Sequence, residues 1–251
     1  MIVALAKQLV RSLSDLALPA ACEVCGGAAG ELRWICPTCL AALEKLEQAP
    51  ACPRCAFPLV LLGDPCPRCR GRGVGRIRHI ARLGVFDAPL RELVHRMKYN
   101  RRWGLCADLA DRLLARTDIR SLVVGADVVV PIPLHWRRSL SRGFNQAELL
   151  ADHLTRHTNR HVVDAIRRRR STPSQTSQTS FTARIRNVRD AFELHRPLSV
   201  AGKRVLLVDD VMTTGATLRE AARALLPAGP ACIDAIVRAV ADPKGHDFAA
   251  L

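Results

Sequence analysis

The chain has 251 residues, of which 49% are hydrophobic, so it can bury one large core or one core with a small appended unit. Its 38 basic residues exceed its 23 acidic residues and give a formal net charge of +15. No apolar run is long enough to cross a bilayer as a helix, which excludes a helical membrane protein and favours a globular one.

The positive charge lies mainly in the later part of the chain. Residues 1–79 contain 10 basic and 6 acidic groups, a net of +4, whereas residues 80–251 contain 28 and 17, a net of +11. Arginine supplies 33 of the basic residues, which suits bidentate phosphate recognition but equally fits a compositional bias of the genome. The charge therefore permits a polyanionic partner without identifying one.

The first 18 residues alternate apolar runs with Lys7, Arg11 and Asp15. This pattern predicts an amphipathic helix and lacks the unbroken apolar segment of a signal peptide. We therefore expect a cytoplasmic protein.

Eight of the ten cysteines form two copies of the pattern Cys-x2-Cys-x10-Cys-x2-Cys, 30 residues apart. The members are Cys22, Cys25, Cys36 and Cys39, then Cys52, Cys55, Cys66 and Cys69. A unit with so little apolar sequence needs another source of stability, and four thiolates hold zinc tetrahedrally in closed structural sites. The repeat predicts a double zinc ribbon that binds about two structural zinc ions.

Other uses of these cysteines fit less well. A disulfide framework requires an oxidising compartment, and a c-type haem site requires a histidine after the second cysteine, which is absent here. Sequential and crossed assignment of the cysteines to two metals both remain open. The lone Cys106 and Cys232 have apolar neighbours and are expected to be buried packing residues.

Glycines at 71, 73 and 75 mark a linker, so we place the domain boundary between residues 79 and 80. After it, residues 80–86 are strand-like, a helix follows Pro89 to about residue 99, and residues 103–116 have the spacing of an amphipathic helix.

Residues 128–130 are three valines and predict a buried strand. The strand leads into Pro131-Ile132-Pro133 and a basic loop with Arg137, Arg138 and Arg142, followed by a helix over 145–156. Three arginines after a strand end suit a pyrophosphate group. The alternative is a basic loop that merely begins the helix.

A third strand is expected over residues 161–166, and a polar loop follows it. The loop begins with Arg167, Arg168, Arg169 and Arg170, and residues 156–189 contain nine arginines and one acid. Such a segment could close over a phosphorylated ligand, follow a nucleic-acid backbone, or serve only as a disordered solubilising loop.

The most informative stretch is 205–218. Four apolar residues, 205–208, predict a strand buried on both faces, and Asp209 and Asp210 stand where it is expected to end. Thr213, Thr214, Gly215, Ala216 and Thr217 then supply hydroxyls, a flexible glycine and the free N–H groups of a starting helix. An ordinary threonine-capped helix would leave the two acids unexplained.

A helix over 216–226 and a buried strand over 232–240 complete the chain. Strand, helix and strand alternate through this half, which predicts a parallel sheet with right-handed crossovers.

The run of two acids followed by Thr-Thr-Gly-x-Thr resembles the phosphoribosyl-pyrophosphate (PRPP) loop of the type I phosphoribosyltransferases. That resemblance implies that Asp209 and Asp210 hold the 2′ and 3′ hydroxyls of PRPP, while residues 213–217 surround its 5-phosphate. The pattern Pro-x-Pro followed by Arg-Gly-Phe-Asn-Gln narrows the resemblance to the ComF family, whose members also carry a double zinc ribbon.

Resemblance to the ComF family implies a type I phosphoribosyltransferase-like α/β domain over 80–251, preceded by the N-terminal helix and ribbons over 1–79. It also implies a role in handling single-stranded DNA during competence or DNA utilisation, beside competence or DNA-processing proteins. The alternative is an active transferase that moves ribose 5-phosphate from PRPP to a base or amine. In that case magnesium would bridge the pyrophosphate, and Arg137, Arg138 and Arg142 would stabilise the leaving charge.

Overall fold

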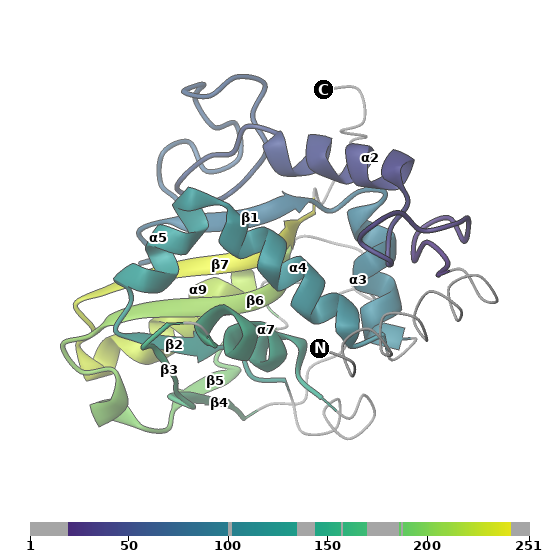
Figure 1. Ribbon diagram of the computed structural model, residues 1–251. Coiled ribbons are helices and arrows are strands. Elements are labelled where there is room, and N and C mark those ends of the chain that lie inside the picture. The colour runs from purple at the N-terminus through teal and green to yellow at the C-terminus, as the bar shows by residue number, and fades with distance from the viewer. Residues whose placement is uncertain are drawn as a thin grey trace, which may run out of the picture.

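A computed structural model describes residues 20–99, 102–134, 144–156, 158–169, 186 and 188–241 (Figure 1). The helix expected over residues 1–18 lies outside these residues. In chain order the elements are α2 (Pro37–Gln48), β1 (Ile80–Val85), α3 (Leu90–Tyr99), α4 (Gly104–Ala115), α5 (Thr117–Gly125), β2 (Val128–Pro131), α7 (Gln146–Thr155), β3 (His161–Val162), β4 (Ile166–Arg168), β5 (Phe192–Leu194), η2 (Pro197–Ser199), β6 (Arg204–Met212), α9 (Ala216–Leu225), η3 (Leu226–Ala228) and β7 (Cys232–Val240).

Five strands form a parallel sheet in the order β1-β7-β6-β2-β3. The central strand β6 is aligned with both neighbours, so that Leu207 pairs with Val130 of β2 and with Ala235 of β7. The predicted parallel sheet is therefore confirmed, together with its strands at 80–86, 128–130, 205–208 and 232–240.

Helices cover both faces of the sheet, as its continuous apolar strands require. On one face α2, α3, α4, α5 and α7 pack against alternate strand residues such as Leu206 and Ile236. On the other face α9 and the short strands β4 and β5 pack against Leu207 and Ala235. In Figure 1, α4, α5 and α7 lie in front of the sheet and α9 lies behind it.

The second cysteine group shares the main hydrophobic core. All four of its cysteines are buried in the same cluster as Val74 of the linker, Met212 of β6 and Ala216 of α9. The first group packs on the other side, where Cys22 is buried with the helix residues of that face.

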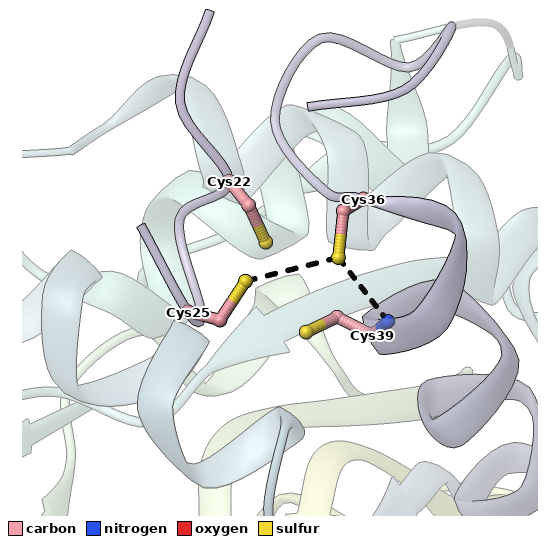
Figure 2. Close-up of side chains that lie close together, drawn as sticks. All are labelled: Cys22, Cys25, Cys36 and Cys39. Carbon is pink, nitrogen blue, oxygen red and sulfur yellow. Dashed lines mark hydrogen bonds between the residues drawn. The ribbon is translucent and has the colours of Figure 1, made fainter. Parts of the chain in front are cut away.

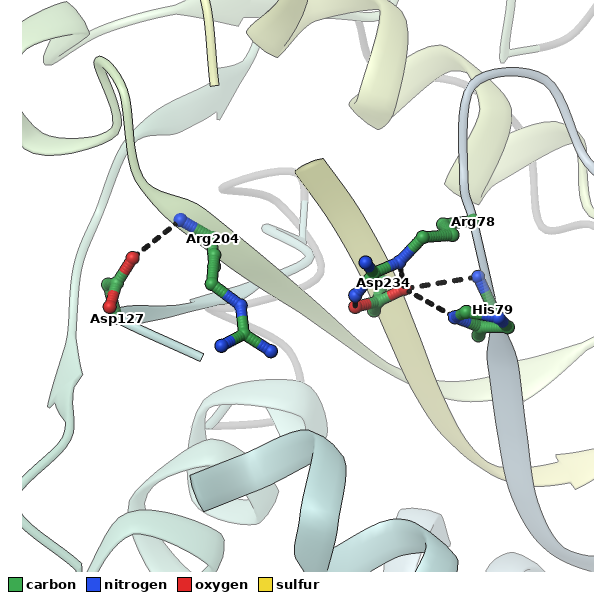
Figure 3. Close-up of polar contacts among 5 residues, drawn as sticks. All are labelled: Arg78, His79, Asp127, Arg204 and Asp234. Carbon is green, nitrogen blue, oxygen red and sulfur yellow. Dashed lines mark hydrogen bonds and ion pairs between the residues drawn. The ribbon is translucent and has the colours of Figure 1, made fainter. Parts of the chain in front are cut away.

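Ionic contacts anchor the linker where it enters the sheet (Figure 3). Asp234 of β7 accepts hydrogen bonds from Arg78 Nη2 at 2.7 Å and from the backbone N–H of His79 at 3.1 Å. In β6, the backbone N–H of Arg204 donates to Asp127 at 2.8 Å. One carboxylate thus joins the amino ends of β1 and β7, and another joins those of β2 and β6.

The single strand expected over 161–166 is wrong, because the structure has two short strands there. Only His161–Val162 join the main sheet as β3, and Ile166–Arg168 form β4, which pairs antiparallel with β5. The two parts separate because Asp164 is exposed, and because Ala165 accepts a hydrogen bond from the backbone N–H of His195 and so turns the chain toward β5. Neither β5 nor α5 was predicted.

The lone cysteines differ from each other. Cys106 is buried, as expected, whereas Cys232 is only half-buried at the first position of β7. Among the residues that the structure describes, no helix combines the length and the apolar character needed to cross a bilayer.

Candidate functional site

The predicted ligand residues lie where the sheet reverses its order. From β2 the chain passes through α7 to β3 on one side, and from β6 it passes through α9 to β7 on the other. Between β2 and β6 the connections therefore diverge to opposite faces, and open α/β sheets bind ligands outside the carboxyl ends of strands at such a point.

Strand β6 extends past its neighbour β2 into this crevice. Pairing with β2 ends at Val208, whereas pairing with β7 continues to Met212. Asp209 and Asp210, expected to follow the strand, therefore lie inside it. The predicted end of the strand is therefore wrong, because β6 continues to Met212. The apolar strand β7 supplies hydrogen-bond partners that the sequence of β6 alone does not reveal.

Asp210 is held between two cations. Arg238 Nη1 of β7 donates to Asp210 Oδ1 at 2.6 Å, and Lys98 Nζ at the end of α3 lies 2.6 Å from Asp210 Oδ2. Arg238 is 0% exposed, and its Nη2 contacts the Cys106 sulfur at 2.7 Å. The ionised Asp210 thus offsets a positive charge that has no access to water.

The two adjacent acids have opposite electrostatic environments. Burial raises the pKa of Asp209 to about 6; the backbone N–H of Asp210 opposes this rise, and the Asp210 charge adds to it. Burial acts in the same direction on Asp210, but Lys98 and Arg238 outweigh it and hold the pKa of Asp210 below its usual value. Asp209 has no ion pair with another described residue, although Lys98 and Arg168 favour its charged form. Asp209 consequently has the greater capacity for a ligand.

The loop after β6 requires glycine at one position. Gly215 has φ +75°, in the left-handed region that favours glycine, and it precedes the first residue of α9. A Cβ at this position would lie 3.0 Å from Val74 Cγ1 of the linker. The loop therefore packs closely against the segment that follows the second cysteine group.

The threonines of the loop have different surroundings. Thr214 is buried and its hydroxyl oxygen accepts a hydrogen bond from the backbone N–H of Ala216 at 3.2 Å, whereas Thr213 and Thr217 are half-buried. The loop thus stabilises the first turn of α9 and brings the predicted phosphate-binding residues together at one end of β6.

The predicted pyrophosphate arginines, Arg137, Arg138 and Arg142, lie outside the described residues. The chain on either side of them is joined at the crevice, because Asn145 Nδ2 donates to the carbonyl oxygen of Ile132 at 3.0 Å. The Asn145 side chain also accepts from the backbone N–H of Ala147 and caps α7. The predicted helix over 145–156 is confirmed as α7.

The arginines expected in a polar loop are partly in a strand. Arg167 and Arg168 belong to β4, which corrects the expectation that the loop begins at residue 167, and Arg170 lies outside the described residues. Glu193 of β5 pairs with Arg167 at 3.4 Å and with Arg169 at 3.1 Å. The guanidinium carbon of Arg168 lies over the Phe192 ring, 5.5 Å from its centroid.

The cysteines form two compact groups of four, each from one copy of the repeat. In the first, the sulfurs of Cys25 and Cys36 are 3.8 Å apart and the Cys36 sulfur accepts from the backbone N–H of Cys39 (Figure 2). In the second, the sulfurs of Cys52 and Cys69 are 3.7 Å apart and those of Cys55 and Cys66 are 3.6 Å apart. Four sulfurs at about 2.3 Å from one zinc ion are separated by about 3.8 Å, so both groups fit the metal, with sequential assignment of the cysteines.

Sequence reasoning missed three residues, two of which lie at the crevice. Lys98 and Arg238 contact Asp210, and Trp103, which is 55% exposed, packs edge-on against Phe144 with ring centroids 5.7 Å apart. Arg238 did leave a signal, because an arginine inside the apolar run of β7 must find a buried counter-charge.

Comparison with known proteins agrees with this geometry. Residues 125–247 match the model of the phosphoribosyl transferase domain. The chain is 33% identical over 223 residues to the DNA utilization protein YhgH of Escherichia coli O6:H1, an alignment that covers 87% of this chain and 96% of that protein. It is 28% identical to Competence protein F of Haemophilus influenzae, an alignment that covers 76% of this chain and 85% of that protein. It is 29% identical to Competence protein ComFC of Bacillus subtilis, with 78% of this chain and 80% of that protein covered.

The opposite environments of the two acids predict opposite effects on stability. Asp210→Asn should lower the free energy of unfolding at pH 7 by about 3–5 kcal/mol, because it leaves a buried arginine without its carboxylate. Asp209→Asn should raise it by about 1–3 kcal/mol, because a carboxyl whose pKa is raised is costly to ionise above pH 6. Urea unfolding of both variants measures the difference. The gain from Asp209→Asn should disappear as the pH falls from about 6 to 4; equal effects of the two substitutions would contradict this account.

Proposed function

The chain belongs to the ComF family, and from this premise we propose that it is a PRPP-binding protein that handles single-stranded DNA in competence or DNA utilisation. The observation that carries the proposal is the pair of acids on β6, next to a glycine-dependent loop at the point where the sheet reverses.

Asp209 is the residue that we assign to a ribose hydroxyl. It lies beyond the end of β2, and it has no ion pair with another described side chain. A carboxylate accepts hydrogen bonds from hydroxyl groups, and the hydroxyl-rich residues 213–217 suit the 5-phosphate.

We assign Asp210 two roles, as the counter-ion of Lys98 and Arg238 and as an acceptor for a ribose hydroxyl. Its two oxygens have ionic partners, but each carboxylate oxygen has a second lone pair that can accept from a ribose hydroxyl. Lys98, which is 19% exposed at its side chain, then stands beside the ligand as a further cation.

Magnesium would enter this site with PRPP, where it supplies charge neutralisation of the pyrophosphate. The residues fit this use, since Asp209 offers hard carboxylate oxygens and Asp210 remains ionised. Arg137, Arg138 and Arg142 remain the proposed pyrophosphate contacts. Release of pyrophosphate with a base or amine would identify a transferase, whereas PRPP binding without release favours the DNA-handling role.

The raised pKa of Asp209 predicts how PRPP binding depends on pH. Above about pH 6 the ionised carboxylate accepts from the ribose, so Asp209→Asn should weaken binding by about 1–3 kcal/mol at pH 7.5. As the pH falls through about 6 the wild-type carboxyl is protonated, and the difference in affinity between the two proteins should shrink by about tenfold between pH 7.5 and pH 5. Calorimetric titration of each protein with PRPP and magnesium measures the difference in affinity at pH 7.5 and its change with pH.

The variant itself is the control, because the phosphate groups of PRPP also titrate near pH 6 and do so equally for both proteins. A constant difference across this pH range would remove Asp209 from the ribose contact. No binding of PRPP by either protein at pH 7.5 would overturn the proposed site.

Two kinds of group support binding of single-stranded DNA. Arg167 and Arg169 are exposed beside a single acid, Glu193, which leaves excess positive charge on this hairpin. The exposed Trp103 and the half-buried Phe144, which follows Arg142 by two residues in the chain, add an aromatic surface. Arginines that neutralise phosphates and aromatics that stack on bases are the usual elements of sequence-tolerant strand binding.

The salt dependence of the affinity separates the contribution of the arginines from that of aromatic stacking. Replacing Arg167, Arg168, Arg169 and Arg170 by glutamine should flatten the plot of log affinity against log salt by about 0.7 for each phosphate that is no longer neutralised. Trp103→Ala should weaken binding by about 1–3 kcal/mol with little change in slope. Fluorescence anisotropy with a labelled oligothymidine measures both effects. Arg120→Gln is the control for the arginines, because α5 packs on the face of the sheet opposite to β4 and β5; absent or salt-independent binding would leave only the transferase hypothesis.

The two cysteine groups are proposed to hold one zinc ion each. The groups differ in exposure, because Cys25 is exposed in the first and all four cysteines of the second are buried. The second group also belongs to the core that contains Met212 and Ala216. Zinc in the second group is therefore expected to support the PRPP loop as well as the ribbon.

Metal removal should consequently occur in two steps. A chelator should remove zinc from the first group faster, and Cys55→Ser should lower the midpoint of thermal unfolding more than Cys25→Ser, although each variant binds about one zinc ion fewer. Elemental analysis and thermal unfolding measure these outcomes. Folded wild-type protein prepared in reducing buffer without any metal would contradict the proposal.

We also propose a location, a domain organisation and partners for the protein. The grouping of the cysteines in fours suits metal-bound thiolates, which persist in a reducing compartment, and this supports a cytoplasmic location. Division into residues 1–79 and 80–251 remains the proposed domain organisation. Competence or DNA-processing proteins remain proposed partners.

A further inference from the structure

A pocket of about 490 Å³ lies outside the edge strand β1, away from the PRPP loop. Its walls come from the chain between α2 and the second cysteine group (48–53), from β1 and the residue before it (79–82), and from α5. No residue of β6 or of the PRPP loop lines it. The volume is in the range of pockets that hold small ligands.

One wall of this pocket contains a buried cation. Arg82 is 3% exposed; its Nη2 donates to the carbonyl oxygens of Ala49 and Pro50 at 3.1 Å and 3.3 Å, and its Nη1 has no hydrogen-bond partner among the described residues. Arg82 also forms no ion pair within the described part of the chain, in contrast to Arg238, which has Asp210. A buried charge that lacks a partner is costly, so its presence here requires a reason.

The neighbouring charges increase the need for an anion. Arg116 also lines the pocket, and its guanidinium is neutralised by Asp118 at 2.9 Å. Burial and then repulsion from Arg116 lower the pKa of Arg82 to about 10, although the Cys55 thiolate acts in the opposite direction, so Arg82 is still charged at neutral pH. Two arginines therefore line one pocket that has a single carboxylate in its lining.

The other walls of the pocket are mainly apolar. They include Pro50, Pro53, Ile80, Leu122 and Leu62, of which Leu62 is 81% exposed. His79 adds one polar ring, which Asp234 holds through Nδ1 at 3.2 Å (Figure 3). Apolar walls with one unpaired cation suit a ligand that has an apolar body and a single oxyanion.

We propose that this pocket is a second ligand site, which binds a small organic oxyanion, a phosphate or a carboxylate, through Arg82. The anion would accept from Nη1 and neutralise the buried guanidinium, while the apolar body of the ligand would cover Ile80 and Leu122. The pocket is separate from the proposed PRPP site, because the two sets of residues do not overlap.

The test uses the full chain as purified with its metal, and phenyl phosphate and benzoate as probes. At least one probe should bind in calorimetry, and hydrogen exchange should show protection of the backbone over 48–53 and 79–82 in the unaltered protein. Arg82→Gln should weaken that binding at least tenfold. Preference for phenyl phosphate or for benzoate assigns the oxyanion as phosphate or carboxylate.

Arg120→Gln, which changes an exposed arginine of α5 outside the pocket, should leave the affinity unchanged. Protection confined to 209–217, or no binding of either probe at millimolar concentration, would overturn the proposal. So would loss of zinc from Arg82→Gln without any probe binding to the unaltered protein, since Arg82 would then serve only to offset the thiolates of the second cysteine group. The exchange measurement on the unaltered chain decides the matter even if Arg82→Gln does not fold.

Discussion

The buried positive charge of Arg238 is the constraint on which the arrangement of the site depends. A guanidinium with no exposure, placed in the strand next to β6, requires a carboxylate at the facing position, and Asp210 meets that requirement at 2.6 Å. The same carboxylate pairs with Lys98 at the end of α3. One acid therefore orders a strand, its neighbour and a helix, while the adjacent acid remains for a ligand.

A second dependence joins the cysteine-rich region to the loop after β6. Val74 lies 3.0 Å from the position of a Cβ on Gly215, so the linker and the loop leave no space between them. The four buried cysteines of the second group belong to the same core as Met212 and Ala216. A metal that orders those cysteines would thereby order one wall of the site. The cysteine repeat is thus part of the structural support of the loop.

Local pattern predicted the elements whose signal lies within one segment. The valines of β2, the apolar run before Asp209 and the helical spacing of α3 and α4 were enough to predict a parallel α/β sheet, and the cysteine repeat predicted two groups of four. The errors arose where a distant partner decides the outcome. Strand β6 continues through its acids because β7 pairs with it, and β4 leaves the main sheet because β5, a short strand without a recognisable pattern, pairs with it instead.

The same distinction explains what could be predicted of the site. Asp209, Asp210 and residues 213–217 are contiguous, so their chemistry could be inferred from the sequence. Lys98 and Arg238 come from two other elements and become neighbours of Asp210 only in the folded sheet. Their effect is nevertheless decisive, because they lower the pKa of one acid while burial raises that of the other. Two residues that look equivalent in sequence therefore have different charge states available to them, and this asymmetry suits a ligand whose neighbouring hydroxyls must be oriented by one fixed and one responsive carboxylate.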